Sequence, residues 1–150
     1  MPTTPKISHA LSGILETAIY AEDLDAARAF YGGILGLEEV TAAEGRHVFF
    51  RCGKTMVLVF NPNETVKQPF DGGLPIPPHG TKDATHVCFS APKDAIEAWT
   101  AHLLKNNIAI ETEFTWPNGA RSVYFRDPAG NSLEFAEPKL WGYDLDESTE

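Results

Sequence analysis

Two stretches of the chain repeat the same order of hydrophobic and polar positions. Residues 14–20 alternate in the manner of a β-strand, and a helical pattern follows over 23–31. About seventy residues later, residues 84–90 alternate again and a second helical pattern covers 92–104. A pattern that recurs at about half the chain length indicates two copies of one structural unit.

Three further strands are predicted in each half, at 37–41, 47–51 and 53–58 and at 108–114, 122–126 and 130–135. The third strands match most clearly, as His47-Val-Phe-Phe-Arg51 and Ser122-Val-Tyr-Phe-Arg126. The expected fold is therefore α+β, with two tandem βαβββ units whose curved mixed sheets form a cleft. The units cover 13–62 and 83–138, with a linker at 63–82, an N-terminal extension at 1–12 and an acidic tail at 139–150.

Composition narrows the range of partners. The 150 residues carry a formal net charge of −9, which opposes the phosphate neutralisation that nucleic-acid binding needs. Nucleic acid is therefore not expected as a partner. A membrane is not expected either, because no run approaches the length of about 18 apolar residues of a membrane span. Cys52 and Cys88 lack disulfide or metal-motif spacing, so both are expected to be reduced. A cytoplasmic location is expected, since no secretory signal pattern is present.

Strand parity sorts the polar residues of the two units. Alternate residues of a strand face opposite sides of a sheet, so helices cover one face and the other stays open. In the second unit this sorting leaves His86 and Glu134 on the open face. It gives Glu16 as the first unit's counterpart of His86, and Val57 as the counterpart of Glu134. If the two sheets curl to face each other, these side chains converge in one concavity, with Val57 as an apolar wall.

One imidazole and two carboxylates make a donor set that suits a divalent metal ion. Nitrogen and oxygen ligands fit Mn, Fe, Ni, Co or Zn, and the two carboxylates balance the charge of such an ion. Glu16, His86 and Glu134 are therefore the candidate metal ligands. Without a metal, Glu16 and Glu134 in one pocket would repel, so that one pKa rises and the two form an acid/base pair. Both carboxylates are accordingly candidate catalytic groups.

Several runs of residues resemble the vicinal oxygen chelate superfamily. They are Leu15–Leu24, Phe30–Leu37, His86–Phe89 and the most specific run, Asp127-Pro-Ala-Gly-Asn-Ser-Leu-Glu134. The superfamily includes glyoxalase I, fosfomycin-resistance thiol transferases, extradiol dioxygenases, methylmalonyl-CoA epimerases and bleomycin-binding proteins. The resemblance implies a divalent-metal-dependent lyase, isomerase or dioxygenase that chelates adjacent oxygens of a small substrate. The alternative is a metal-free protein that binds a small molecule or an antibiotic, as bleomycin-resistance proteins do.

The resemblance also implies roles for single residues. It places the family's metal ligands at Glu16, His86 and Glu134, while glyoxalase I has a fourth ligand, a glutamate, at the position assigned to Val57. A chain with valine there is similar to the three-ligand sites of the thiol transferases and dioxygenases. Glu16 is then either the third ligand or a mobile general base.

The substrate pocket and the assembly are predicted on weaker signals. Open-face parity adds His47, Phe49 and Tyr124 to Val57 as expected pocket residues. Exposed sheet edges and the dimers common in the family imply a homodimer, in which both chains can contribute to each site.

Overall fold

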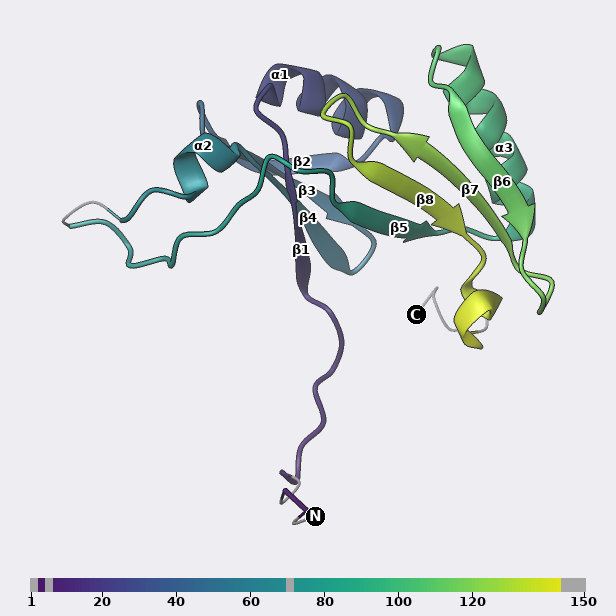
Figure 1. The fold of residues 1–150 in the computed structure, drawn as a ribbon, viewed down its shortest axis with the longest axis horizontal. Coiled ribbons are helices and arrows are strands. Elements are labelled where there is room, and N and C mark those ends of the chain that lie inside the picture. Colours follow the sequence, from purple (N-terminus) through teal and green to yellow (C-terminus); the bar gives the residue numbers. More distant parts are fainter. Residues whose placement is uncertain (1–2, 5–6, 70–71, 144–150) are drawn as a thin grey trace.

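The structure is a computed structural model that describes residues 3–4, 7–69 and 72–143 (Figure 1). The elements of the first unit are β1 (Glu16–Tyr20), α1 (Leu24–Ala27), η1 (Arg28–Ile34), β2 (Glu38–Ala43), β3 (His47–Cys52) and β4 (Thr55–Phe60). A short helix, α2 (Pro62–Thr65), begins the linker. The second unit contains β5 (His86–Ser90), α3 (Lys93–Lys105), β6 (Ile110–Thr115), β7 (Arg121–Arg126) and β8 (Ser132–Ala136), before the 3₁₀ turn η2 (Pro138–Trp141).

The strands form two four-stranded sheets, ordered β1-β4-β3-β2 and β5-β8-β7-β6. In each sheet the first strand pairs in parallel with the fourth, and the remaining pairs are antiparallel. This identical topology confirms the predicted α+β fold of two βαβββ units. Of the two terminal segments expected from the sequence, residues 1–2, 5–6 and 144–150 lie outside the described residues.

The helical segment of the first unit changes its winding at a pair of glycines. Gly32–Gly33 lie inside η1, where the backbone N–H of Leu35 donates to the carbonyl of Phe30, five residues earlier, at 2.9 Å. This wider π-helical turn ends at Ile34. A Cβ at Gly32 would lie 3.3 Å from the ring of Phe50, so the glycine allows the helix to lie close to β3. The glycine pair therefore loosens the helix and does not end it.

The helix-covered faces of both sheets share one hydrophobic core. Its fully buried members are Ile19, Val48, Phe50 and Val59 of the first sheet, Val123, Phe125 and Leu133 of the second, Tyr31 of η1, and Ile96 and Leu103 of α3. The ring of Phe30 on η1 lies 6.4 Å from the ring of Phe125, centroid to centroid, across the boundary between the units. Each open face is therefore on the side of its sheet away from the common core. The two open faces do not face each other within one chain.

A buried polar clamp joins the two units. The carboxylate of Asp127, which is 5% exposed, accepts a hydrogen bond from the hydroxyl of Tyr31 at 2.6 Å and from the amide of Asn131 at 2.9 Å. The same Asn131 amide donates to the backbone carbonyl of Tyr20 at 2.9 Å, and its oxygen accepts from the N–H of Thr85 at 3.0 Å. The loop between β7 and β8 is thereby anchored to β1, to η1 and to the residue before β5.

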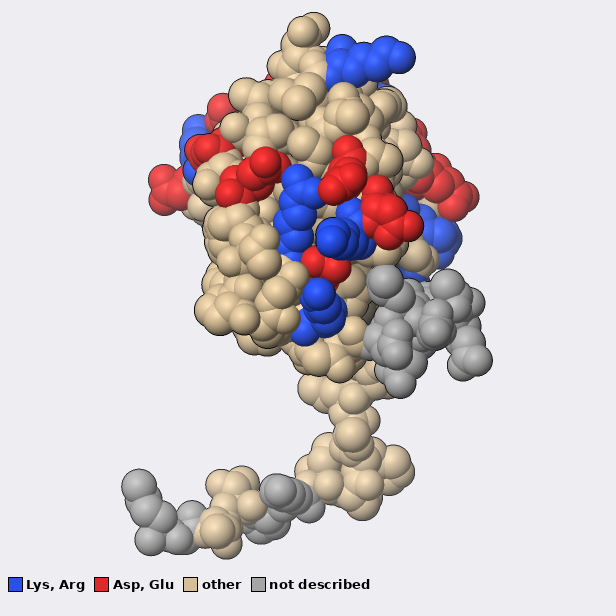
Figure 2. All heavy atoms as spheres, turned by 90° about the vertical axis from the view of Figure 1, so that its right-hand side faces the viewer, with Lys and Arg blue, Asp and Glu red and all other residues tan. Residues whose placement is uncertain are grey.

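The surface of the protein carries charged side chains of both signs. On the side where α3 and β6 lie, acidic and basic side chains are interspersed (Figure 2). The ion pairs of Arg121 with Glu97 and Glu113, and of Arg126 with Glu111, contribute to this mixture. No helix among the described residues is long and apolar enough to cross a membrane.

Candidate functional site

Glu134 lies at the centre of the open face of the second sheet. The strand register places Cys88 of β5 and Tyr124 of β7 directly beside it. The Glu134 side chain is 6% exposed, and the hydroxyl of Ser122 donates to its Oε2 at 2.5 Å. Desolvation, and then the neighbouring Glu134 carboxylate, raise the pKa of both the Tyr124 hydroxyl and the Cys88 thiol. Because burial of an unpaired carboxylate is costly, the hydrogen bond from Ser122 stabilises Glu134 in one orientation.

His86 is held by its backbone neighbour so that it points at Glu134. Its Nδ1 lies 2.8 Å from the carbonyl oxygen of Ser132, which can only accept, so Nδ1 carries a proton. Its Nε2 lies 3.2 Å from Oε1 of Glu134. A protonated Nε2 would form an ion pair with this carboxylate, whereas Nε2 and Oε1 can also serve together as ligands of a cation. The Ser132 hydrogen bond orients the ring in the way that is usual for metal-binding histidines.

A second layer of contacts fixes Ser122. The indole N–H of Trp116 donates to the Ser122 oxygen at 2.8 Å, which leaves the serine hydrogen free to point at Glu134. Ser122 is fully buried. Ser122 lies two residues before Tyr124 on β7 and therefore shares its face, but Trp116 follows the end of β6, where strand parity no longer predicts the direction of a side chain.

The prediction for Val57 was wrong. Val57 is 3% exposed and belongs to the hydrophobic core, on the helix-covered face of the first sheet. Leu58 is the residue that lies between Ala18 and Phe49, as Glu134 lies between Cys88 and Tyr124. The first unit thus has an apolar trio where the second unit has a thiol, a carboxylate and a phenol.

Glu16 lies at the start of β1, exposed, and pairs with Met56. This position corresponds to that of His86, which starts β5 and pairs with Ser132. The structure of one chain does not bring Glu16 to His86 and Glu134, since the two open faces point away from the common core. Among residues 3–4, 7–69 and 72–143, no cluster of three or more His, Cys, Asp or Glu side chains is arranged to hold a metal ion. A role for Glu16 stays a prediction.

The open face of the first sheet carries a five-ring cluster, made of Tyr20, His47, Phe49, Phe60 and His79. His47 and Phe49 lie on this face as predicted, and their rings stack with centroids 4.1 Å apart. Phe60 contacts the other four rings, and His79 reaches the cluster from the linker. Burial, and then the charge of Arg46, keep the pKa of His47 below its ordinary value. The face is thus aromatic and uncharged apart from its margin.

Cys88 provides a direct probe of the Glu134 carboxylate. Desolvation, and then the neighbouring carboxylate of Glu134, raise the pKa of the Cys88 thiol to about 12. In chelator-treated protein carrying Cys52→Ser, we expect a disulfide reagent at pH 8 to modify Cys88 at least about 100-fold more slowly than free cysteine, because the thiolate is the reactive form. Glu134→Gln is expected to speed this reaction by about tenfold. A wild-type rate equal to that of free cysteine would contradict the placement of Cys88 beside a buried carboxylate.

The comparisons with known proteins agree with this architecture. The chain matches the model of the Glyoxalase/Bleomycin resistance protein/Dioxygenase superfamily over residues 9–135, and it belongs to that superfamily. The crystal structure of a lactoylglutathione lyase from Agrobacterium tumefaciens is 47% identical in sequence, with a TM-score of 0.85, covering 90% of this chain and 100% of that chain. A glyoxalase/dioxygenase from Nostoc punctiforme is 26% identical, with a TM-score of 0.64, covering 91% of this chain and 97% of that chain. No curated protein gives a significant match.

The match confirms the family suggested by the sequence motifs. Superfamily members generally use a divalent metal ion, act on small molecules and are commonly dimeric. The similarity to a lactoylglutathione lyase supports an enzyme of the lyase type.

Proposed function

We propose that the protein is a divalent-metal-dependent lyase that acts on a small substrate with two adjacent oxygen atoms. The observation that carries this proposal is the geometry of His86 and Glu134, whose Nε2 and Oε1 atoms lie 3.2 Å apart. The other imidazole nitrogen is hydrogen-bonded to the carbonyl of Ser132, and the other carboxylate oxygen accepts from the hydroxyl of Ser122. The similarity to a lactoylglutathione lyase over 90% of the chain supports the reaction class. Conjugates of glutathione are therefore the first substrates to test.

The donor set fits a metal ion in part. His86 and Glu134 would hold it, whereas Leu58 offers no donor atom at the position that corresponds to Glu134. A bound divalent ion would supply Lewis-acid polarisation of the substrate oxygens. Glu16 is the remaining candidate, and we propose that it takes a proton from the substrate carbon, or completes the ligand set, from the first unit of a second copy of the chain.

The proposed site is therefore shared between two chains. Each site combines the Glu134 face of one copy with the Glu16 face of the other, because one chain directs these faces away from its core. His86, Ser122 and Tyr124 position the carboxylate, and the apolar surface around Leu58 would exclude water from the reacting atoms.

The first experiment measures metal content and turnover. Chelator-treated protein is reloaded separately with Mn, Fe, Ni, Co or Zn, and formation of lactoylglutathione from glutathione and methylglyoxal is followed. We expect activity to return with at least one ion, and about one ion to be bound per chain. Less than about a tenth of an ion per chain, with no turnover, would overturn the proposal in favour of a metal-free binding protein.

A second experiment tests the shared site. Glu16→Ala and Glu134→Ala chains are inactive alone if both residues act, and equal mixing makes half of all dimers mixed. In each mixed dimer a shared arrangement leaves one site intact, so the mixture is expected to recover about a quarter of wild-type activity. A site within one chain predicts no recovery, because every site then contains one altered residue.

A further inference from the structure

We infer that residues 7–15 form an arm that packs into an apolar groove on a second copy of the chain. The groove lies between the two units, beside Trp99 of α3. The inference rests on the shared site proposed above, because that site brings the second copy to the start of β1, where the arm ends. It adds a contact, outside the reacting residues, that holds the two copies together.

The arm is apolar and lies outside the two units. Figure 1 and Figure 2 both show the segment before β1 running away from the rest of the chain. Its four large aliphatic side chains, which are 74–96% exposed, are Ile7, Leu11, Ile14 and Leu15. Residues 7–15 contain no Asp, Glu, Lys or Arg, although these residue types make up 22% of the chain. Because exposed aliphatic side chains are unfavourable in water, an uncharged run of them is typical of a segment that binds another surface.

The arm is anchored to its own chain at its C-terminal end. The backbone N–H of Met56 donates to the carbonyl of Leu15 at 3.0 Å, and the hydroxyl of Thr55 donates to the carbonyl of Ile14 at 3.3 Å. The preceding residue, Gly13, has φ +139°, a conformation that glycine adopts readily and that lets the chain turn away from the sheet. The aliphatic side chains before this glycine can therefore reach a partner.

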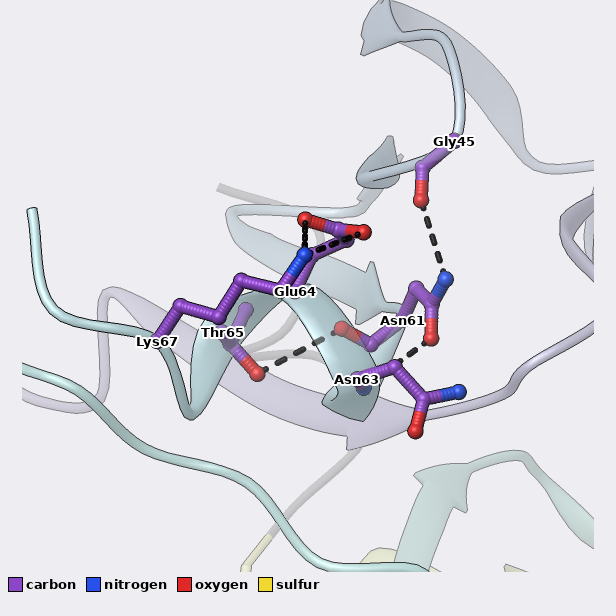
Figure 3. A network of polar contacts seen from close by, with 6 residues as sticks. All are labelled: Gly45, Asn61, Asn63, Glu64, Thr65 and Lys67. Carbon is purple, nitrogen blue, oxygen red and sulfur yellow. Dashed lines mark hydrogen bonds and ion pairs between the residues drawn. The ribbon is translucent and has the colours of Figure 1, made fainter. Parts of the chain in front are cut away.

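The linker also lies outside the two units, but it is held differently. At its start, the side-chain amide of Asn61 donates to the carbonyl of Gly45 at 3.0 Å, and its side-chain oxygen accepts from the N–H of Asn63 at 3.0 Å (Figure 3). Near its other end, the N–H of His79 donates to the carbonyl of Thr65 at 2.9 Å. The linker is thus fixed at both ends, whereas the arm is fixed at one. For this reason we assign the exchanged contact to the arm.

The groove offers the arm a matching apolar surface. One part of it is a cavity of about 110 Å³ at the boundary between the units, lined by Leu35 and Leu37 of the first unit and by Phe89 and Trp99 of the second. Trp99 also lines the other part, a cavity of about 250 Å³ along α3. None of the described residues that line either cavity is Asp, Glu, Lys or Arg. Since an apolar cavity of about 150 Å³ can hold benzene, the groove has room for aliphatic side chains.

The arm is long enough to reach this groove on the second copy. In the proposed shared site, Glu16 of one copy lies beside Glu134 of the other. Phe135 follows Glu134 on β8 and lines the groove from the opposite face of the sheet. Because β5 is the edge strand of that sheet, the arm has to pass around one strand, over a layer about 10 Å thick. Residues 7–15 span up to about 30 Å when extended, which leaves several residues to occupy the groove.

Dissociation constants of the dimer measure what the arm contributes. In the full chain, Leu11→Ser is expected to raise the dissociation constant at least about tenfold, because twofold symmetry removes two buried leucines from each dimer. Leu104→Ser is the matched control. Leu104 is also exposed, and it lies two residues after His102 on α3, so helical periodicity turns it away from the groove. Sedimentation equilibrium is expected to give the control the dissociation constant of the wild type.

A thiol cross-link shows where the arm binds and on which copy. Cys52 lines the groove, so Leu11→Cys in a chain that carries Cys88→Ala places one thiol on the arm and one in the groove. A short bis-maleimide is expected to join them into a covalent dimer on a denaturing gel, and Cys52→Ala should remove this product. A link between the two thiols of a single chain would show that the arm occupies its own groove, which overturns the exchange.

The outcomes separate this inference from the proposed function. A monomeric wild type, an unchanged dissociation constant in Leu11→Ser, or no cross-link to Cys52 overturns the exchanged arm, whether or not the wild type shows metal-dependent turnover. A weakened Leu11→Ser dimer and a covalent dimer through Cys52, in a protein without metal-dependent turnover, support the arm and overturn the lyase. If Leu11→Cys does not fold, Ile7→Cys places the thiol further along the arm, and the same covalent dimer is expected.

Discussion

Replacing Glu134 with glutamine is expected to remove most bound metal and to lower kcat/KM at least about 100-fold, because changes even behind a metal ligand cost 10–100-fold. Glutamine has nearly the shape of glutamate, and its side-chain oxygen can still accept the hydrogen bond that Ser122 donates at 2.5 Å. Its amide can donate to Nε2 of His86, so the fold keeps its polar contacts. The free energy of unfolding should therefore change by about 1 kcal/mol or less.

Metal content, turnover and denaturant unfolding of the Glu134→Gln variant separate a ligand from a structural carboxylate. Glu113→Gln is the matched control, because Glu113 is an exposed carboxylate on the same sheet, paired with Arg121. The control is expected to bind metal and turn over substrate as the wild type does. Unchanged metal content in Glu134→Gln would show that Glu134 is not a ligand, whatever the effect on activity.

The fold could be predicted because the same pattern of hydrophobic and polar positions occurs twice along the chain, once for each unit. The βαβββ order depends only on alternation, helical periodicity and turn residues, which are local properties of the sequence. Pairing of the first strand with the fourth then follows in both halves. The helix of the first unit extends past its predicted end at residue 31 to Ile34, because Gly32 and Gly33 allow a π-helical turn that packs on Phe50.

The error at Val57 has a single geometric cause. In the first unit Arg51 pairs with Met56, five residues later, but in the second unit Arg126 pairs with Ser132, six residues later. Gly53 lies three residues before Met56, whereas Gly130 lies two residues before Ser132, so aligning the two hairpins on these glycines shifts one strand by a residue. A shift of one residue exchanges the two faces of a strand, so Val57 was assigned to the open face that Leu58 occupies.

The partners of Glu134 were only partly predictable. Parity places His86 and Tyr124 on its face, since both lie on strands next to β8. Parity does not tell which way two packed units face, because that depends on contacts such as Phe30 with Phe125, between residues far apart in sequence. For this reason the convergence of Glu16 with His86 and Glu134 was not found within one chain.

Replacing Asp127 with alanine is expected to lower the free energy of unfolding by about 3–5 kcal/mol. The Asp127 carboxylate accepts four hydrogen bonds: from the Tyr31 hydroxyl, from the Asn131 side-chain amide, and from the backbone N–H groups of Ala129 and Asn131. Alanine leaves these donors unsatisfied at a buried boundary between the units. In the wild type, desolvation and then Asp127 raise the pKa of Tyr31, so the phenol stays protonated and donates to this carboxylate.

Denaturant unfolding of three variants measures the coupling energy between Asp127 and Tyr31. The variants are Asp127→Ala, Tyr31→Phe and the double variant. Tyr31→Phe removes one donor and leaves Asp127 with three, so a loss of about 1–2 kcal/mol is expected, with a coupling energy of at least about 1 kcal/mol in the cycle. Asp25→Ala, whose side chain is 98% exposed, is the control and should change stability by about 0.5 kcal/mol at most. Because Asp127 also sets the loop that leads into β8, the variant is expected to weaken metal binding at Glu134. A loss below about 1 kcal/mol would show that the apolar core, and not this clamp, holds the two units together.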